Sequence, residues 1–412
     1  MNQSAFKTVA TKPLSWPREG CAKPACAKRC VAVAAGFSLV EVMVAMVIGL
    51  LGIIVMMQMF SVFEGQKRTT GGGDDAISSG AVSLYGAQRN MQQSGWGISS
   101  VEVIGCTVSG LLVGGAALPL IPVTINSALI TGQDANTDTL LIVSGNGNGT
   151  VEGDTIDAVP AANSYAVKTP TGFLVGERVV AVPLARPSPC TLALTTVTAV
   201  ASPNVSVSAG FAGIVPGDKL FNLGPAPTVR AYAVRNQNLT VCDYTANDCG
   251  LAANNGDATV WVPVANNVVS LRAQYGRDNT NMAVTMDGVV DVWDRTRPVP
   301  AFPAGNSANA CALIRASAVR IVLVARSSQP EKTADWPALT VHVTPAAPLW
   351  AGSDTVVLTS INAVEAAAVA INLPDPDPTW PTGLDFRYKI FQTVVPLRNV
   401  HIPPASGLVP SC

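Results

Sequence analysis

Histidine and charge are both scarce in this chain of 412 residues, which contains two histidines and in which 13% of the residues are charged. Neither His342 nor His401 belongs to an HExxH, HxxxH or CxxC…H pattern, so the sequence offers no recognisable zinc site. No GxSxG motif is present to supply a catalytic serine. We therefore expect a protein that is not an enzyme and that holds neither a metal nor a cofactor.

Clustered positive charge is also lacking beyond the first residues. The formal net charge is −1, but residues 1–36 carry six Lys and Arg residues against Glu19 alone, which gives that segment +5 and the remainder −6. Nucleic-acid binding needs clustered Lys and Arg, so no nucleic-acid partner is expected. A basic segment before an apolar run is a targeting signal whose charge marks the cytoplasmic side of a membrane.

The apolar run itself is long. Val42–Met57 reads VMVAMVIGLLGIIVMM without a polar side chain, and four polar residues interrupt the wider stretch from Phe37 to Phe63. At a rise of ~1.5 Å per residue, such a helix spans a bilayer core of ~30 Å. The residues after Phe60 offer no small-residue cleavage site, so the run is expected to remain as a membrane helix.

Glu41 is the unusual residue of this helix, because an unpaired carboxylate in lipid costs several kcal/mol. It either reaches the interface by itself or finds a partner. The string Gly36-Phe37-Ser38-Leu39-Val40-Glu41, between the basic leader and the apolar helix, resembles the processing site of type IV prepilins. The resemblance implies that a prepilin peptidase cuts between Gly36 and Phe37 and that Phe37 is N-methylated. It also implies that Glu41 pairs with the new amino group of a neighbouring subunit during assembly.

The polar stretch after Phe63 keeps a helical period. Six residues of this stretch fall at helical spacing and predict one packed face: Ile77, Ala81, Leu84, Tyr85, Gln88 and Met91. The helix is expected to end near Ser94 and Gly95, and Gly71–Gly73 is predicted to be a weak point or a break.

From residue 96 onward, short Val- and Thr-rich runs alternate with Gly, Asn, Pro and Asp. The clearest runs are Thr139–Val143, Arg178–Val182, Thr191–Val200, Ala318–Val324 and Phe386–Val395. Their lengths predict a mostly antiparallel β head. The expected fold is therefore α+β, with a prepilin leader (1–36), a transmembrane and assembly helix (37–95) and a β-rich head (96–412).

Two polar segments of the head invite a ligand hypothesis. The glycine-rich stretch Gly145–Thr150 follows a strand but lacks the GxGxxG spacing, so it is interpreted as a turn. The segment from Asp278 through Asp287 and Asp291 to Asp294 suggests calcium, but it lacks the spacing, the glycine and the final glutamate of an EF-hand. A polar hairpin is the favoured interpretation.

The nine cysteines divide between the leader, which has three, and the head, which has six. An even number in an oxidising compartment predicts disulfides, with free buried thiols as the alternative. The sequence does not choose among the possible pairings. The pair Cys242–Cys249 is the best single candidate, because CDYTANDC has the composition of a tight polar loop.

Four further segments resemble landmarks of PilW-type minor pilins of the type IV pilus. They are Met91–Ile98, Val268–Arg277, Ala316–Ser327 and Phe386–Val400, whereas the span between Val101 and Val268 matches only loosely. The resemblance implies a minor subunit that primes pilus assembly with other minor pilins and the major pilin on an inner-membrane assembly platform. It further implies a tip complex with a PilY-type adhesin that supports adhesion or twitching motility.

The same resemblance implies a location in the inner membrane, with the head in the periplasm, before assembly and in the pilus on the cell surface afterwards. Two alternatives stay open. One is a J-type pseudopilin of a type II secretion system, a family related to PilW. The other is a membrane-anchored β-rich module that binds a surface, for which an aromatic content of 6% gives little support.

Overall fold

The computed structural model describes the backbone of residues 37–278, 286–296, 307–331, 344, 346–353, 364–365, 369–373 and 383–400. Gly36, the leader with its three cysteines, both histidines and Cys412 lie outside these residues. The chain divides into two compact units, Met1–Val62 and Phe63–Cys412.

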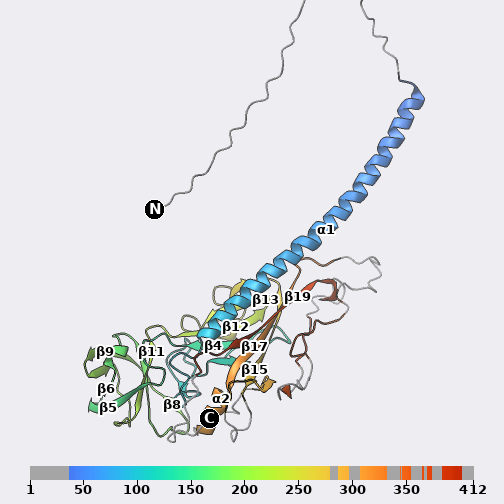
Figure 1. Cartoon of the computed structure of the whole chain (residues 1–412). Helices are drawn as coiled ribbons and strands as arrows, with labels where there is room; N and C mark the ends of the chain where they lie inside the picture. The colour runs from blue at the N-terminus through green and yellow to red at the C-terminus, as the bar shows by residue number, and fades with distance from the viewer. Residues whose placement is uncertain are drawn as a thin grey trace, which may run out of the picture. The chain divides into compact units, whose positions relative to one another are not determined.

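Helix α1 extends from Leu39 to Gln93 (Figure 1). It begins with a cap, because the Ser38 Oγ accepts a hydrogen bond of 3.2 Å from the N–H of Glu41. The predicted end near Ser94 is confirmed, but the predicted break at Gly71–Gly73 is wrong, since the helix continues through it. A reason lies at Gly72, where an added Cβ would be 3.3 Å from the Cβ of Ser327, so the lost helix propensity is offset by close packing.

The head-facing side of α1 is a stripe of mostly small residues at spacings of three and four. Its buried members are Gly72, Ala76, Gly80, Ser83, Ala87 and Met91. The predicted face was wrong in part, because Ile77 and Tyr85 are 45% and 66% exposed. Small side chains bring the helix backbone close to the head, and a Cβ on Gly80 would lie only 2.2 Å from the ring of Phe391.

Two five-stranded sheets make up the part of the head that packs against α1. The first has the order β14 (Val262–Ala265), β13 (Asn238–Asp243), β12 (Thr228–Arg235), β4 (Leu140–Ser144) and β3 (Val123–Ile125). The second has the order β18 (Val364–Glu365), β16 (Val292–Asp294), β15 (Val268–Arg277), β17 (Ala316–Arg326) and β19 (Tyr388–Pro396). All neighbours are antiparallel except β16 and β18, so the predicted α+β class with a mostly antiparallel head is confirmed.

The helix and both sheets share one hydrophobic core. Ala87 and Met91 of α1 pack there together with Ile142 of β4 and with Leu271 and Ile321 of β15 and β17. Met91, Leu271 and Ile321 are fully buried. The second half of α1 is therefore the common support of the two sheets.

Six further strands form a closed antiparallel barrel, and several of them are labelled in Figure 1. Its order is β10 (Asn204–Val207), β6 (Ser164–Val167), β5 (Asp154–Ala161), β11 (Lys219–Gly224), β7 (Arg178–Val182) and β9 (Leu194–Ala201). The barrel has its own core, which includes Tyr165, Phe173 and Leu220. It lies in the chain between β4 and β12, which are paired neighbours of the first sheet, and it is thus an insertion into that sheet.

Smaller elements complete the head. They are a three-stranded sheet of β2 (Leu118–Pro119), β1 (Thr107–Val108) and β8 (Thr191–Leu192), the helix α2 (Ser307–Ile314), and the short helices η1 (Pro170–Gly172), η2 (Ala252–Asn254) and η3 (Gly383–Asp385). The predicted strand Arg178–Val182 matches β7 residue for residue, whereas the predicted strand Thr191–Val200 is divided into β8 and β9. The sequence did not predict the barrel, because its closure pairs strands that are distant in the chain.

The contact between Gly80 and Phe391 gives a first testable prediction. Gly80→Ala is expected to lower the free energy of unfolding by about 1–3 kcal/mol, because the new methyl group overlaps the ring. Gly86→Ala is the matched control, since nothing lies within 4 Å of its added Cβ, and it is expected to gain up to about 1 kcal/mol of helix propensity. Urea unfolding of both variants in detergent measures the difference. Equal midpoints for the two variants would contradict the close contact.

Candidate assembly site

The first part of α1 presents an exposed apolar surface. Phe37 is 80% exposed, and the large apolar side chains that follow, up to Val62, are all at least 40% exposed. By length and composition α1 is able to cross a membrane, with a mean hydropathy of 2.7 in its most apolar window. Such a surface needs lipid or neighbouring helices as its surroundings, so it is compatible with membrane anchoring.

Two of the predicted site residues lie at the start of this helix. Phe37 precedes the capping residue Ser38, and Glu41 is the acidic residue of the first turn. Within the described part of the chain, Glu41 has no cationic partner. The predicted cleavage residue Gly36 lies outside the described residues.

The opposite end of α1 is fastened by side chains from two parts of the head. Asn399 donates from its amide nitrogen to the carbonyl oxygens of Gln93 (3.1 Å) and Ser94 (3.0 Å). The Ser144 hydroxyl donates to the same Gln93 oxygen at 2.7 Å. The last carbonyls of a helix lack partners within the helix, so these bonds satisfy them and fix its end to β4 and to the segment after β19.

Gly95 then turns the chain out of the helix. Its φ of +84° lies in the left-handed region, and its N–H donates to the Val143 oxygen at 2.9 Å.

Asn90, in the last turns of α1, binds strand β12. It donates to the Tyr232 hydroxyl and accepts a bond of 2.8 Å from the Arg230 guanidinium. Burial raises the pKa of Tyr232, which keeps the phenol neutral as a hydrogen-bond partner. Strand β12 is thereby joined to α1 as well.

A buried carboxylate joins the two sheets. Asp138, which is fully buried, forms ion pairs with Arg272 of β15 and with Arg295. One of its oxygens accepts a bond of 3.0 Å from the Asn126 amide, and the other accepts one of 3.0 Å from the Ala273 N–H. Burial lowers the pKa of Arg272, and the charge of Asp138 opposes that shift. The charges are held in place by several bonds at once.

Tyr275 makes a second connection between the sheets. Its hydroxyl accepts a hydrogen bond of 2.7 Å from the N–H of Ile125, which lies on the edge strand β3 of the first sheet. The sequence had singled out Val268–Arg277 by resemblance alone. The structure assigns Arg272 and Tyr275 of that segment to the joint between the sheets.

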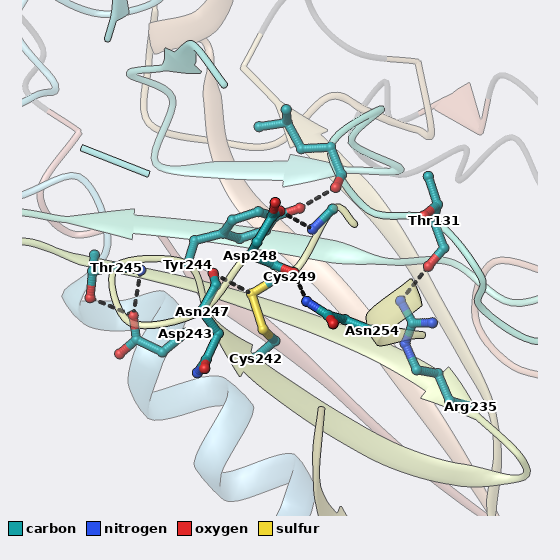
Figure 2. The surroundings of a disulfide bond; sticks show 12 residues. Thr131, Arg235, Cys242, Asp243, Tyr244, Thr245, Asn247, Asp248, Cys249 and Asn254 are labelled. Carbon is teal, nitrogen blue, oxygen red and sulfur yellow. Dashed lines mark hydrogen bonds between the residues drawn. A yellow bond between two sulfur atoms is a disulfide. The ribbon is translucent and has the colours of Figure 1, made fainter. Parts of the chain in front are cut away.

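The structure forms a disulfide between Cys242 and Cys249, the pair that the sequence favoured (Figure 2). The enclosed loop is ordered by its own polar side chains, since Asp243 accepts bonds from the N–H and the hydroxyl of Thr245 at 2.9 and 2.6 Å. The Tyr244 hydroxyl donates to a carbonyl of a neighbouring loop, and burial raises the pKa of Tyr244 to about 12. The disulfide and these hydrogen bonds together hold the loop in a tight conformation.

Beside this loop, the Arg235 guanidinium lies 3.8 Å from the centre of the Trp261 ring and donates to the Gly132 oxygen at 2.8 Å. Both side chains are almost fully buried. The contact is a cation–π interaction that holds the loop around Gly132 against the first sheet. It has no counterpart in the sequence predictions.

The barrel is attached to the segment that follows α1. A disulfide joins Cys106 to Cys190, and Arg186 donates to the carbonyl oxygens of Val101 (2.8 Å) and Ile104 (2.7 Å). An ion pair of 2.9 Å between Lys219 and Glu102 adds a further tie. Cys311 is disulfide-bonded as well.

The glycine-rich segment Gly145–Thr150 connects β4 to the barrel. The Trp96 indole donates to the Gly147 oxygen at 2.8 Å, and an added Cβ at Gly149 would lie 2.8 Å from the Asn222 side chain. Its glycines therefore serve close packing against β11, and the segment is an irregular connection with a bend at Asn148 and Gly149.

The acidic segment that invited a calcium hypothesis has internal partners. Asp278 accepts hydrogen bonds from the N–H groups of Asp287 (3.3 Å) and Gly288 (2.6 Å), and Asp294 is paired with Arg277 at 2.6 Å. Residues 279–285 lie outside the described part. Among the residues that the structure describes, no group of three or more His, Cys, Asp or Glu side chains is placed to hold a metal ion.

Comparison with known proteins adds one finding. A family model described as Type IV Pilus-assembly protein W matches residues 231–399. That segment contains β13, β15, β17, β19 and most of β12, together with Arg272, Tyr275 and Asn399, whereas α1 and the barrel lie outside it. No curated protein and no solved structure matches the chain. The family match supports a role in type IV pilus assembly.

The ion pairs of Asp138 give the second prediction. Asp138→Asn is expected to destabilise the chain by about 3 kcal/mol, because two arginines lose their buried counter-charge. Asp157→Asn on the exposed side of β5 is the control, with an expected change within about 0.5 kcal/mol. Urea unfolding measures both. A loss below about 1 kcal/mol for Asp138→Asn would contradict the expectation that the two arginines depend on this carboxylate as their counter-charge.

Proposed function

We propose that this chain is a minor subunit of a type IV pilus, processed between Gly36 and Phe37. The observation that carries the proposal is the match of residues 231–399 to a pilus-assembly family, in a head whose matched strands pack against α1. The start of that helix adds support, because the Gly-Phe-Ser-Leu-Val-Glu string lies there and is followed by an exposed apolar surface.

Cleavage after Gly36 would create a positive amino group on Phe37, which N-methylation would leave charged. In lipid, the carboxylate of Glu41 needs a counter-charge. Because the amino group and the carboxylate belong to the same first turn, the amino group of one subunit meets Glu41 of the next when their helices stack with a small axial offset. This pairing selects one register among the many that apolar helices permit.

The role that follows is structural and not catalytic. Before assembly, the chain would reside in the inner membrane with its head in the periplasm. It would then associate with other minor pilins and the major pilin on the assembly platform and prime filament assembly. A place at the pilus tip would bring the head next to a PilY-type adhesin and would link it to adhesion or twitching motility.

Replacement of Glu41 tests the assembly step. Glu41→Ala is expected to reduce the amount of the chain in sheared pili by about tenfold or more, while its amount in the membrane stays unchanged, because export does not use this carboxylate. An unpaired partner charge in lipid costs several kcal/mol, and tenfold corresponds to about 1.4 kcal/mol. Gln58→Ala on the same helix is the control. Normal incorporation of Glu41→Ala would count against the pairing.

The mature N-terminus tests the proposal as a whole. Mass spectrometry of the chain purified from membranes is expected to find N-methylated Phe37 as the first residue. An intact leader, or a first residue beyond Phe63, would exclude a pilus subunit. Loss of pili in a strain that lacks the chain, with type II secretion intact, would separate the pilus role from that of a pseudopilin.

A further inference from the structure

Strand β19 lies at the edge of the second sheet and pairs with β17 over nine residues without a register shift. The N–H of Leu397 donates to the Ser317 oxygen, and the N–H of Ser327 donates to the Arg387 oxygen, both at 2.8 Å. Antiparallel neighbours alternate between bonded and non-bonded pairs. The odd-numbered residues of β19 therefore bond to β17, and the backbone groups of Ile390, Gln392 and Val394 point away from the sheet.

The other sheet edges in the described part of the head are short or protected. Strand β14 has four residues and contains Pro263, which has no N–H to offer. Strand β3 has three residues, and the N–H of Ile125 is taken by Tyr275. Strand β18 has two residues. Natural proteins commonly protect long edges in such ways, yet β19 has nine residues and no proline before its last position.

The outer part of β19 also shows apolar side chains. Ile390 and Val394 are 36% and 49% exposed and lie on the same face as Gln392. On that face, Trp350 and Ile371 pack on the central strands β15 and β17, and Ala351 donates to the Gln392 side chain at 3.1 Å. Trp350, Ile371 and the residues around them therefore leave Ile390 and Val394 exposed. An additional strand could bond to the outward backbone groups there and could pack against both side chains.

We propose that β19 accepts an extended segment of another pilus subunit as an added strand of the second sheet. This inference rests on the proposed function. Hydrogen-bonding groups spaced two residues apart along an edge match an extended backbone. Phe391, on the opposite face, contacts Gly80 of α1, so the added strand joins the chain beside the helix through which subunits associate.

The positive charges near β19 favour a segment of another subunit over a second copy of this chain. Lys389 and Arg398 are exposed near the two ends of β19, and neither has a carboxylate partner among the described residues. Strand β19 itself contains no acidic residue. Self-pairing would bring like charges together, which is unfavourable across strands, whereas a segment with acidic residues flanking its apolar positions is complementary.

A proline at an outward position tests the proposal, because it removes an N–H that β17 does not use. Val394→Pro is expected to lower incorporation into sheared pili by about tenfold or more, and Val394→Ala, which keeps the N–H, is expected to lower it less than threefold. Thermal unfolding of both full-length variants in detergent shows whether the pairing of β17 with β19 survives. A folded Val394→Pro chain that enters pili as the wild type does would overturn the proposal.

Hydrogen–deuterium exchange on the wild-type chain decides the case even if Val394→Pro fails to fold. The amides of Ile390, Gln392 and Val394 are expected to exchange at least about tenfold more slowly in sheared pili than in the detergent-solubilised single chain. Equal rates would overturn the strand addition. Protection that is already present in the dilute single chain would show that a segment of the same chain covers the edge. Protection that grows with concentration would show that a second copy covers it. Either result would also overturn the proposed strand addition.

The two proposals fail in different ways. Wild-type chains that start at Phe37 and are present in sheared pili, but whose outward amides exchange rapidly, would contradict only the added strand. Wild-type chains absent from pili would contradict the proposed function and the inference that rests on it. A crosslink from a photoreactive residue at position 394 to an extended, acidic segment of an identified pilus subunit would support both.

Discussion

The close approach between the small-residue stripe of α1 and the two sheets is the contact on which the head depends. Gly72, Ala76, Gly80 and Ala87 place almost no side-chain volume between the helix backbone and the strands. Only at this short distance can Asn90 reach Tyr232, and only then does the end of the helix meet Ser144 and Asn399. A shift of about one methyl diameter would open the shared core and lose these polar contacts together.

The helix alone would leave the two sheets free to slide against one another. Asp138 and Tyr275 prevent this, because each joins a residue next to the first sheet, or within it, to β15 of the second. Buried ion pairs of this kind contribute little net stability, since desolvation offsets much of the attraction. They affect the geometry of the head more than its stability. The several donors around the Asp138 carboxylate can all bond to it in only one arrangement of the strands. The joint thus supplies orientation, and the apolar core supplies most of the free energy.

The sequence predicted the features that are determined by residues close together in the chain. The continuous apolar helix, strand β7 and the short loop between Cys242 and Cys249 depend on neighbouring residues, and the sequence indicated each of them. The packed face of α1 was predicted less well, because large side chains were expected inside. Close helix–sheet contact instead favours small ones, so Tyr85 lies outside. Barrel closure and the partners of Asp138 involve residues far apart in the chain, for which no local signal exists.

The family match begins close to the point where the chain leaves the barrel. The match begins within β12, immediately after the barrel returns the chain to the first sheet beside β4. Because β4 and β12 are hydrogen-bonded neighbours, the inserted barrel enters and leaves at one place and does not disturb the contacts of α1. Its attachment through Cys106, Cys190 and Arg186 involves the segment after the helix and not the helix stripe. A head built in this way can change its barrel while the support of the sheets by α1 and the long edge at β19 stay as they are.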